Sequence, residues 1–211
     1  VKDRFPHDFS AVAHVATAPW YLAAGGICPH CHTKRTWRAP VVEVGMILLF
    51  AGSALFLSSN LAYLFVAWLY GWYLVVVAVI DLETRRVLNV MTAVGAIVAI
   101  AVSAILKIPP LPSSLAGGIV AFLLFFALYW IGRAMFGRGA LGLGDVKLVG
   151  VIGLMTGYPQ VLTALLVGSL LGGAVGIFLI ATHRAKLKST GAYAPFLVAG
   201  ALFSLWSTLA H

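Results

Sequence analysis

Negative charge is scarce in this sequence. Its 211 residues include only six Asp and Glu, and charged residues make up 9% of the chain against 62% hydrophobic residues. Soluble domains carry about 25% charged residues, so the polar surface is too small to solvate a sizeable water-facing module. Cysteine is also scarce. The chain has two cysteines, which are too few for a secreted scaffold framed by disulfides. The composition therefore predicts a membrane protein.

The alternation of polar and apolar residues that marks a half-buried strand is absent. Unbroken apolar runs instead approach the roughly 20 residues that a helix needs to cross a bilayer, and in lipid only helices and closed barrels satisfy the backbone. We expect an all-α, polytopic helical bundle with about seven membrane segments, at 41–58, 61–80, 89–106, 113–136, 146–157, 160–182 and 194–210. The segment 146–157 is short, so it would need flanking residues or a locally thinned bilayer to cross.

The net charge of +8 is explained by membrane orientation. If the segments cross alternately, every Lys and Arg except Lys107 falls on one side, and the positive-inside rule makes that side the cytoplasm. The N-terminus is then cytoplasmic, and no nucleic-acid partner is needed to account for the charge. Residues 1–40 are expected to form a cytoplasmic or interfacial segment, with an interfacial or re-entrant piece at 11–24, ahead of a membrane domain at 41–211.

Two aspartates lie where an apolar run meets a cytoplasmic loop. Asp81 follows YLVVVAVI and Asp145 precedes VKLVGVIG, so both map to the same membrane face. Ionisable groups at such positions are costly to bury and usually functional. Two carboxylates that share a site cannot both ionise easily, so one can polarise a peptide carbonyl while the other activates water. Because helix dipoles favour an anion at an N-terminus, Asp145 is expected to be the base and Asp81 the acid.

Structural explanations exist for each aspartate taken alone. Asp145 opens a helix after a glycine-rich run, which is an ordinary N-cap position. Asp81 could pair with Arg85 one helical turn later. Glu83 lies two residues after Asp81, so on a helix it points away from it and is expected to be a solvated charge. Three glycines, Gly168, Gly172 and Gly176, recur at the spacing that lets two membrane helices approach closely.

The motifs around these aspartates resemble those of the type IV prepilin peptidases, a branch of the GxGD aspartyl membrane proteases. The first motif is similar to Asp81-Leu82-x6-Asn89-x2-Thr92, and the second to Gly142-x-Gly144-Asp145-x-Lys147-Leu148. A weaker match is Ala194-Pro195-Phe196-Leu197. Cys28-Pro29-x-Cys31, running into Trp37-Arg38-Ala39-Pro40, is similar to the cysteine arm of the family. Leu88 departs from the family pattern, which has proline before Asn89, and this is expected to alter the turn.

The resemblance implies a multi-pass aspartic endopeptidase of the inner membrane, which removes the leader of prepilin or pseudopilin precursors at the cytoplasmic face. Asp81 and Asp145 would be catalytic, while Gly142, Gly144, Lys147 and Asn89 would bind substrate or support the loop. Peptide cleavage would need no cofactor. Members of the family often also methylate the new terminus with S-adenosylmethionine, but residues 1–27 lack the longer N-terminal part tied to that activity, so neither methylation nor that cofactor is expected.

Cys28 and Cys31 have the spacing of half a zinc site. Four ligands are needed, so a complete site would require His7, His14 or a second chain, and free thiols in a vestigial arm are the alternative. For the whole chain, two functions outside proteolysis stay open. A proton-coupled transporter also uses intramembrane Asp residues and glycine-broken helices, and a non-catalytic assembly protein could bind pilins without cutting them.

Overall fold

The computed structural model describes residues 38–57, 60–84, 87–136, 142–182 and 193–209 of the chain. The chain divides into two compact units, Val1–Val44 and Gly45–His211, and both Asp81 and Asp145 belong to the second. The N-terminal arm, with Cys28, Cys31 and the apolar piece at 11–24, lies outside the described residues, as does most of the expected segment 1–40.

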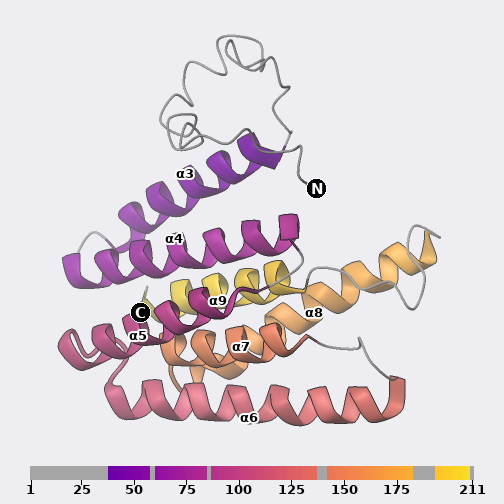
Figure 1. The fold of residues 1–211 in the computed structure, drawn as a ribbon. Helices are drawn as coiled ribbons and strands as arrows, with labels where there is room; N and C mark the ends of the chain where they lie inside the picture. Colours follow the sequence, from indigo (N-terminus) through magenta and orange to yellow (C-terminus); the bar gives the residue numbers. More distant parts are fainter. Residues whose placement is uncertain (1–37, 58–59, 85–86, 137–141, 183–192, 210–211) are drawn as a thin grey trace, which may run out of the picture. The chain divides into compact units, whose positions relative to one another are not determined.

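Within the described part, all regular structure is helical, and Figure 1 colours the helices along the chain from indigo to yellow. The elements are α3 (Arg38–Leu57), α4 (Leu61–Thr84), α5 (Asn89–Ile105), α6 (Leu111–Phe136), α7 (Leu143–Thr156), α8 (Gln160–Ala181) and α9 (Ala194–Leu209). The seven apolar runs are thus all helices, with ends a few residues from the predicted ones, because apolar content fixes where a helix lies better than where it stops.

Three of these helices are long and apolar enough to cross a membrane, over Leu61–Leu82, Leu111–Met135 and Gln160–Phe178. Shorter apolar helices are present at Val44–Leu55, Asn89–Ile105 and Ala194–Thr208. This supports a helical membrane protein. Many large apolar side chains remain exposed on these helices, as expected for surfaces that face lipid rather than water.

Side-chain hydrogen bonds near the helix ends show that α6 and α7 run antiparallel to each other, as do α8 and α9. Ser113 Oγ, at the start of α6, donates to the carbonyl of Tyr158 just after α7 at 2.7 Å. Ser204 Oγ, late in α9, donates to the carbonyl of Gln160 at the start of α8 at 2.8 Å. Helix α7 also begins beside Asn89, the first residue of α5. Asp81, near the end of α4, interacts with the beginnings of both α7 and α9. The N-termini of α5, α7 and α9 therefore share one end of the bundle with the C-terminus of α4.

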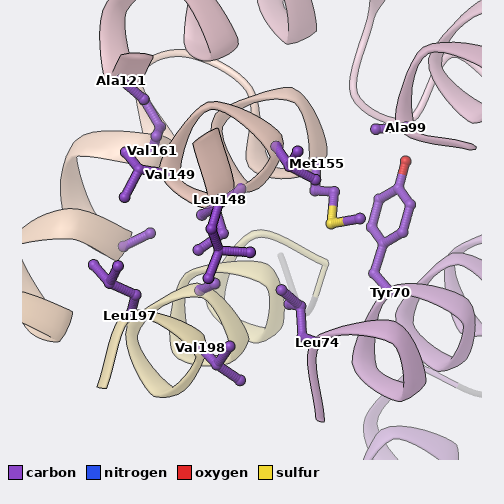
Figure 2. Packing of buried hydrophobic residues seen from close by; sticks show 14 of the residues in the cluster. Tyr70, Leu74, Ala99, Ala121, Leu148, Val149, Met155, Val161, Leu197 and Val198 are labelled. Atoms are coloured by element: carbon purple, nitrogen blue, oxygen red, sulfur yellow. The ribbon is translucent and has the colours of Figure 1, made fainter. Parts of the chain in front are cut away.

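Helix α7 is the central helix of this unit. Nine of its 14 residues are buried, on all sides of the helix, and it packs against α5, α6, α8 and α9. Figure 2 shows the Met155 side chain of α7 extending toward the ring of Tyr70 of α4, and Leu148 of α7 belongs to the same buried cluster as Val198 of α9. Because the buried residues lie on all sides of the helix, α7 is surrounded mainly by protein rather than by lipid. The shortness of α7 is therefore accommodated by the helices around it, whereas the sequence had suggested flanking residues or a thinned bilayer.

Glycine allows α7 to lie close to α6. A Cβ atom added to Gly117 of α6 would lie 2.5 Å from the carbonyl oxygen of Gly153 of α7, and one added to Gly153 would overlap the backbone of Gly117. At the far end of α7, Gly157 has φ +74°, a conformation that side chains rarely adopt, and its amide donates to the carbonyl of Gly153 at 2.9 Å. The two helices thus touch backbone to backbone.

The glycine ladder of α8 makes only part of the predicted contact. A Cβ atom on Gly168 would lie 3.0 Å from the carbonyl oxygen of Phe196, and one on Gly172 would lie 2.9 Å from the ring of Tyr193. A Cβ atom on Gly176 would meet nothing within 4 Å. The first two glycines therefore bring α8 against the beginning of α9, and the third plays no part in this contact.

Candidate active site

Asp81 lies three residues before the end of α4, and its side chain is only 4% exposed. The backbone amide of Ala194, the first residue of α9, donates a hydrogen bond to the Asp81 carboxylate. The other carboxylate oxygen, Oδ2, is buried and has no hydrogen-bond partner among the described residues. A buried carboxylate oxygen without a donor is costly, and such exceptions are concentrated at functional sites. Asp81 therefore presents one anchored and one unengaged oxygen.

Asp145 is the third residue of α7, whose N-cap is Gly142. The sequence had offered an N-cap role as the structural alternative, and the structure corrects this: the residue at that position is Gly142, whose own backbone amide donates to the Asp145 carboxylate. This is the reciprocal half of a capping box, in which the third helical residue reaches back to the N-cap amide. The bond holds the carboxylate over the beginning of α7.

The pKa of Asp145 is raised to about 6, mainly by burial and further by the negative charge of Asp81, while the hydrogen bond from Gly142 opposes the rise. Asp145 precedes the apolar segment 146–157, and it is close enough to Asp81 for their charges to interact. The helix dipole alone would have lowered this pKa, so burial and the second carboxylate outweigh it. The helix dipole therefore does not decide which aspartate is the base, so that assignment stays a prediction, and the two groups titrate as a pair.

Both glycines of the GxGD motif are required by close contacts, and the contact differs between the two positions. A Cβ atom on Gly142 would lie 3.0 Å from Oδ2 of Asp145, so a side chain there would press on the carboxylate. A Cβ atom on Gly144 would lie 3.0 Å from Cβ of Val87, in the connection between α4 and α5. The first glycine leaves room for the carboxylate, and the second lets α7 approach the chain just beyond Asp81. We infer that both position the aspartate pair.

Lys147 and Asn89 are also brought together. Nζ of Lys147, on α7, donates to Oδ1 of Asn89, the first residue of α5, at 2.8 Å. Both side chains are exposed, so the bond contributes little to stability, but it links α7 to the beginning of α5. Leu88 precedes it as the N-cap of α5, with φ −72° and ψ 133°. Proline has φ near −65°, so leucine at this position keeps a proline-like backbone, whereas an altered turn was expected.

Other predicted residues lie outside the described part of the chain. These are Cys28 and Cys31, with the proposed zinc ligands around them, and Arg85, the alternative partner of Asp81. Glu83 is in α4, but its side chain is not described. Among the residues that the structure does describe, no group of three or more His, Cys, Asp or Glu could hold a metal ion.

The role of Ala194 was not anticipated from the sequence. Its stretch, Ala194-Pro195-Phe196-Leu197, stood out only as a weak motif without an assigned function. Every residue except proline carries a backbone amide, so residue type does not reveal which amide binds a carboxylate. The available signal was the motif alone, at the start of an apolar run. The structure gives the motif a place by putting the N-terminus of α9 against Asp81.

Comparison with known proteins identifies a family and relatives that match the region containing these residues. Residues 68–177 match the model of the type IV leader peptidase family. The chain is 28% identical over 199 residues to the prepilin leader peptidase/N-methyltransferase of Pseudomonas putida, an alignment that covers 88% of this chain and 65% of that relative. It is 28% identical over 204 residues to the protein of the same name from Aeromonas salmonicida, covering 96% of this chain and 69% of the relative.

A further relative is the prepilin leader peptidase/N-methyltransferase of Burkholderia pseudomallei strain K96243, 27% identical over 187 residues. The alignment covers 88% of this chain and 60% of that protein. The chain thus spans about two thirds of the length of the curated relatives that it matches. No solved structure matches it. The matched region contains both Asp81 and Asp145, but ends before α9.

Proposed function

Because this chain belongs to the type IV leader peptidase family, we propose that it is a membrane aspartic endopeptidase that removes the leader from type IV prepilin-like precursors, with Asp81 and Asp145 as the catalytic pair. The observation that carries the proposal is the convergence of these two carboxylates from α4 and α7 within electrostatic reach of each other. Each is tied to one backbone amide, and one oxygen of Asp81 is left without a donor.

The chemistry follows from the coupling of the two groups. Since neighbouring carboxylates resist ionising together, the pair keeps one proton over a range of pH. The ionised member takes a proton from a water molecule, which attacks the carbonyl carbon of the scissile peptide. The protonated member donates a hydrogen bond to the carbonyl oxygen, and the leaving amine then receives a proton as the C–N bond breaks. The pair supplies both acid and base, so the proposal involves no cofactor.

The proposal places the protein in the inner membrane as a multi-pass protein with about seven segments and its N-terminus in the cytoplasm. The clustering of Lys and Arg at one set of helix ends supports this orientation. Asp81, Asp145 and the beginning of α9 share one end of the bundle, so under this orientation the catalytic pair faces the cytoplasm. The precursor would then present the junction between its basic leader and its apolar helix at that face.

The test is cleavage of a type IV prepilin precursor by the detergent-solubilised full chain, followed by the mass of the product. Wild type should release the leader, while Asp81→Asn and Asp145→Asn should remain folded and lose cleavage by a factor of about 10³ or more, the scale expected when a catalytic acid or base is removed. Lys107→Met, a change at the opposite end of the bundle, serves as a control and should cleave as wild type does.

Other results assign other functions. Full cleavage by both Asn variants contradicts the dyad. Precursor binding without cleavage by wild type identifies a non-catalytic assembly protein, and proton flux that depends on Asp81 in liposomes identifies a transporter. The product mass also reports methylation, since an unmethylated N-terminus is expected for a peptidase that acts without S-adenosylmethionine.

A further inference from the structure

In the first turn of α9, one backbone amide donates to a side chain from another helix. A helix begins with amides that have no partner inside the helix. Here the amides of Phe196 and Leu197 both donate to the carbonyl of Tyr193, at 3.1 and 3.4 Å, so Tyr193 is the N-cap. Pro195, the second helical residue, has no N–H. Ala194 thus offers the one remaining amide of this turn, and it donates to Asp81.

The receiving carboxylate is buried, and only one of its oxygens is engaged. Asp81 is 4% exposed, and its Oδ2 has no partner among the described residues. A carboxylate at a helix N-terminus ordinarily accepts bonds from the amides of the second or third residue. At the second position this chain has proline, so the donor that could engage the other oxygen is missing.

We propose that Ala194 and Pro195 are positioning residues for Asp81: the Ala194 amide anchors one carboxylate oxygen, and Pro195 withholds a second donor so that Oδ2 stays free for the reaction. The inference deepens the proposed function, because it rests on Asp81 being catalytic. It also assigns a role to the stretch Ala194-Pro195-Phe196-Leu197, which lies beyond the region that matches the family model.

The packing of α9 makes the anchor rigid. Ala194 and Leu197 are buried, at 0% and 1% exposure. A Cβ atom on Gly168 of α8 would lie 3.1 Å from Cα of Leu197, so the two helices are in backbone contact one turn after Ala194. The amide is therefore held by a close helix crossing rather than by a loop, as a positioning group should be.

The ordinary explanation of Pro195 is helix initiation, since proline is common in the first turn of helices. A matched control separates the two explanations. Pro112 is the second residue of α6, the same position in a helix that begins at the other end of the bundle. Replacing either proline by alanine adds one amide at the second helical position, but only the change at position 195 adds it beside Asp81.

Titration of the carboxyl groups gives a readout that does not depend on activity. The chain contains four aspartates, Asp3, Asp8, Asp81 and Asp145, so carbon-13 labelling of the Asp carboxyl gives few signals, and Asp81→Asn assigns one of them. Besides Asp81, the titratable side chains described on α5, α7, α9 and the residue before α9 are Asp145, Lys147 and Tyr193. The tyrosines of α4 lie more than two turns earlier.

In Pro195→Ala, the added amide should donate to Oδ2 and favour the anion, so Asp81 should titrate about one pH unit lower than in wild type. The pH–rate profile for cleavage of a prepilin precursor should move in the same direction, and kcat should fall because Oδ2 is occupied. Pro112→Ala should leave both measurements unchanged. Pro195→Gly, which also supplies an amide, should reproduce the shift and serves as a second variant if alanine impairs folding.

A measurement on unmodified protein tests the anchor itself. Tyr193-Ala194 is the one Tyr-Ala pair in the sequence, so labelling Tyr at the carbonyl carbon and Ala at nitrogen selects the Ala194 amide alone. Its chemical shift should follow the titration of Asp81, and this dependence should vanish in Asp81→Asn. The proposal is overturned if the chemical shift of the Ala194 amide does not follow the titration of Asp81. It is also overturned if the Asp81 carboxyl titrates identically in wild type and Pro195→Ala. If the shifts occur but no precursor is cleaved, the positioning stands and the proposed function fails.

Discussion

The raised pKa of Asp145 makes the stability of the protein depend on pH in a defined direction. Folding raises this pKa from 3.8 to about 6, so the folded state binds a proton that the unfolded chain has already released between these values. The group therefore stabilises the fold fully below pH 3.8, and this contribution is lost as the pH rises through 6. Asp145→Asn keeps the shape of the side chain but cannot ionise, so it should lose less stability than wild type over this range.

The magnitude follows from the two pKa values. A single group shifted from 3.8 to about 6 loses about 2 kcal/mol of stabilisation between pH 4.5 and pH 7.5. For a chain of this size, that corresponds to roughly 4–8 °C in melting temperature. The advantage of Asp145→Asn over wild type should therefore grow by about that amount from the lower to the higher pH.

Thermal unfolding of the detergent-solubilised protein at a series of pH values measures this difference. Asp81→Asn provides an internal test of the cause: it removes the neighbouring charge but not the burial, so the pH dependence should shrink without disappearing, since burial is the larger contribution. Parallel curves for wild type and Asp145→Asn across pH 4.5 to 7.5 would refute the claim that Asp145 is partly buried beside a second carboxylate.

Three further predictions concern packing and the site. Gly153→Ala places a methyl group against the backbone of α6 and should lower the free energy of unfolding by about 1–3 kcal/mol, whereas Gly173→Ala, with open space around it, should be neutral or slightly stabilising in chemical denaturation. Gly144→Ala pushes α7 away from the α4–α5 connection and should reduce kcat for precursor cleavage at least tenfold with little change in far-UV circular dichroism. Lys147→Met removes the bond to Asn89 and should lower kcat/KM while changing stability by less than about 1 kcal/mol; Lys147→Arg should restore part of the activity, and an unchanged kcat/KM in Lys147→Met would contradict a positioning role.

The sequence predicts the helices well because a lipid environment allows few backbone conformations. With no water to satisfy the backbone, an apolar run has no alternative to a helix, and all seven runs are helices. The shared location of Asp81 and Asp145 also follows from counting alternate crossings, since this needs only the direction of each helix. Both inferences use one helix at a time and require no knowledge of which helices touch.

What could not be predicted depends on neighbours. An apolar run does not reveal whether it faces lipid or protein, so nothing in the residue pattern indicates that α7 is the buried centre of the unit. The same gap explains the pKa of Asp145: the helix dipole can be read from position in the chain, but burial and the nearby Asp81, which outweigh it, depend on packing. The pairing of Lys147 with Asn89, 58 residues apart, is likewise set by packing.

The glycines of α8 show where spacing stops being informative. Gly168, Gly172 and Gly176 have identical four-residue spacing, yet a Cβ atom would meet backbone at the first, a side chain at the second and nothing at the third. Crossing helices separate with distance from their closest point, so only the residues near the crossing need to be small. The contact of Gly168 extends to Phe196 and Leu197, within one turn of Ala194, so the close approach of α8 and α9 also constrains the amide that binds Asp81. Enlarging Gly168 should therefore disturb the titration of Asp81, whereas enlarging Gly176 should leave it unchanged.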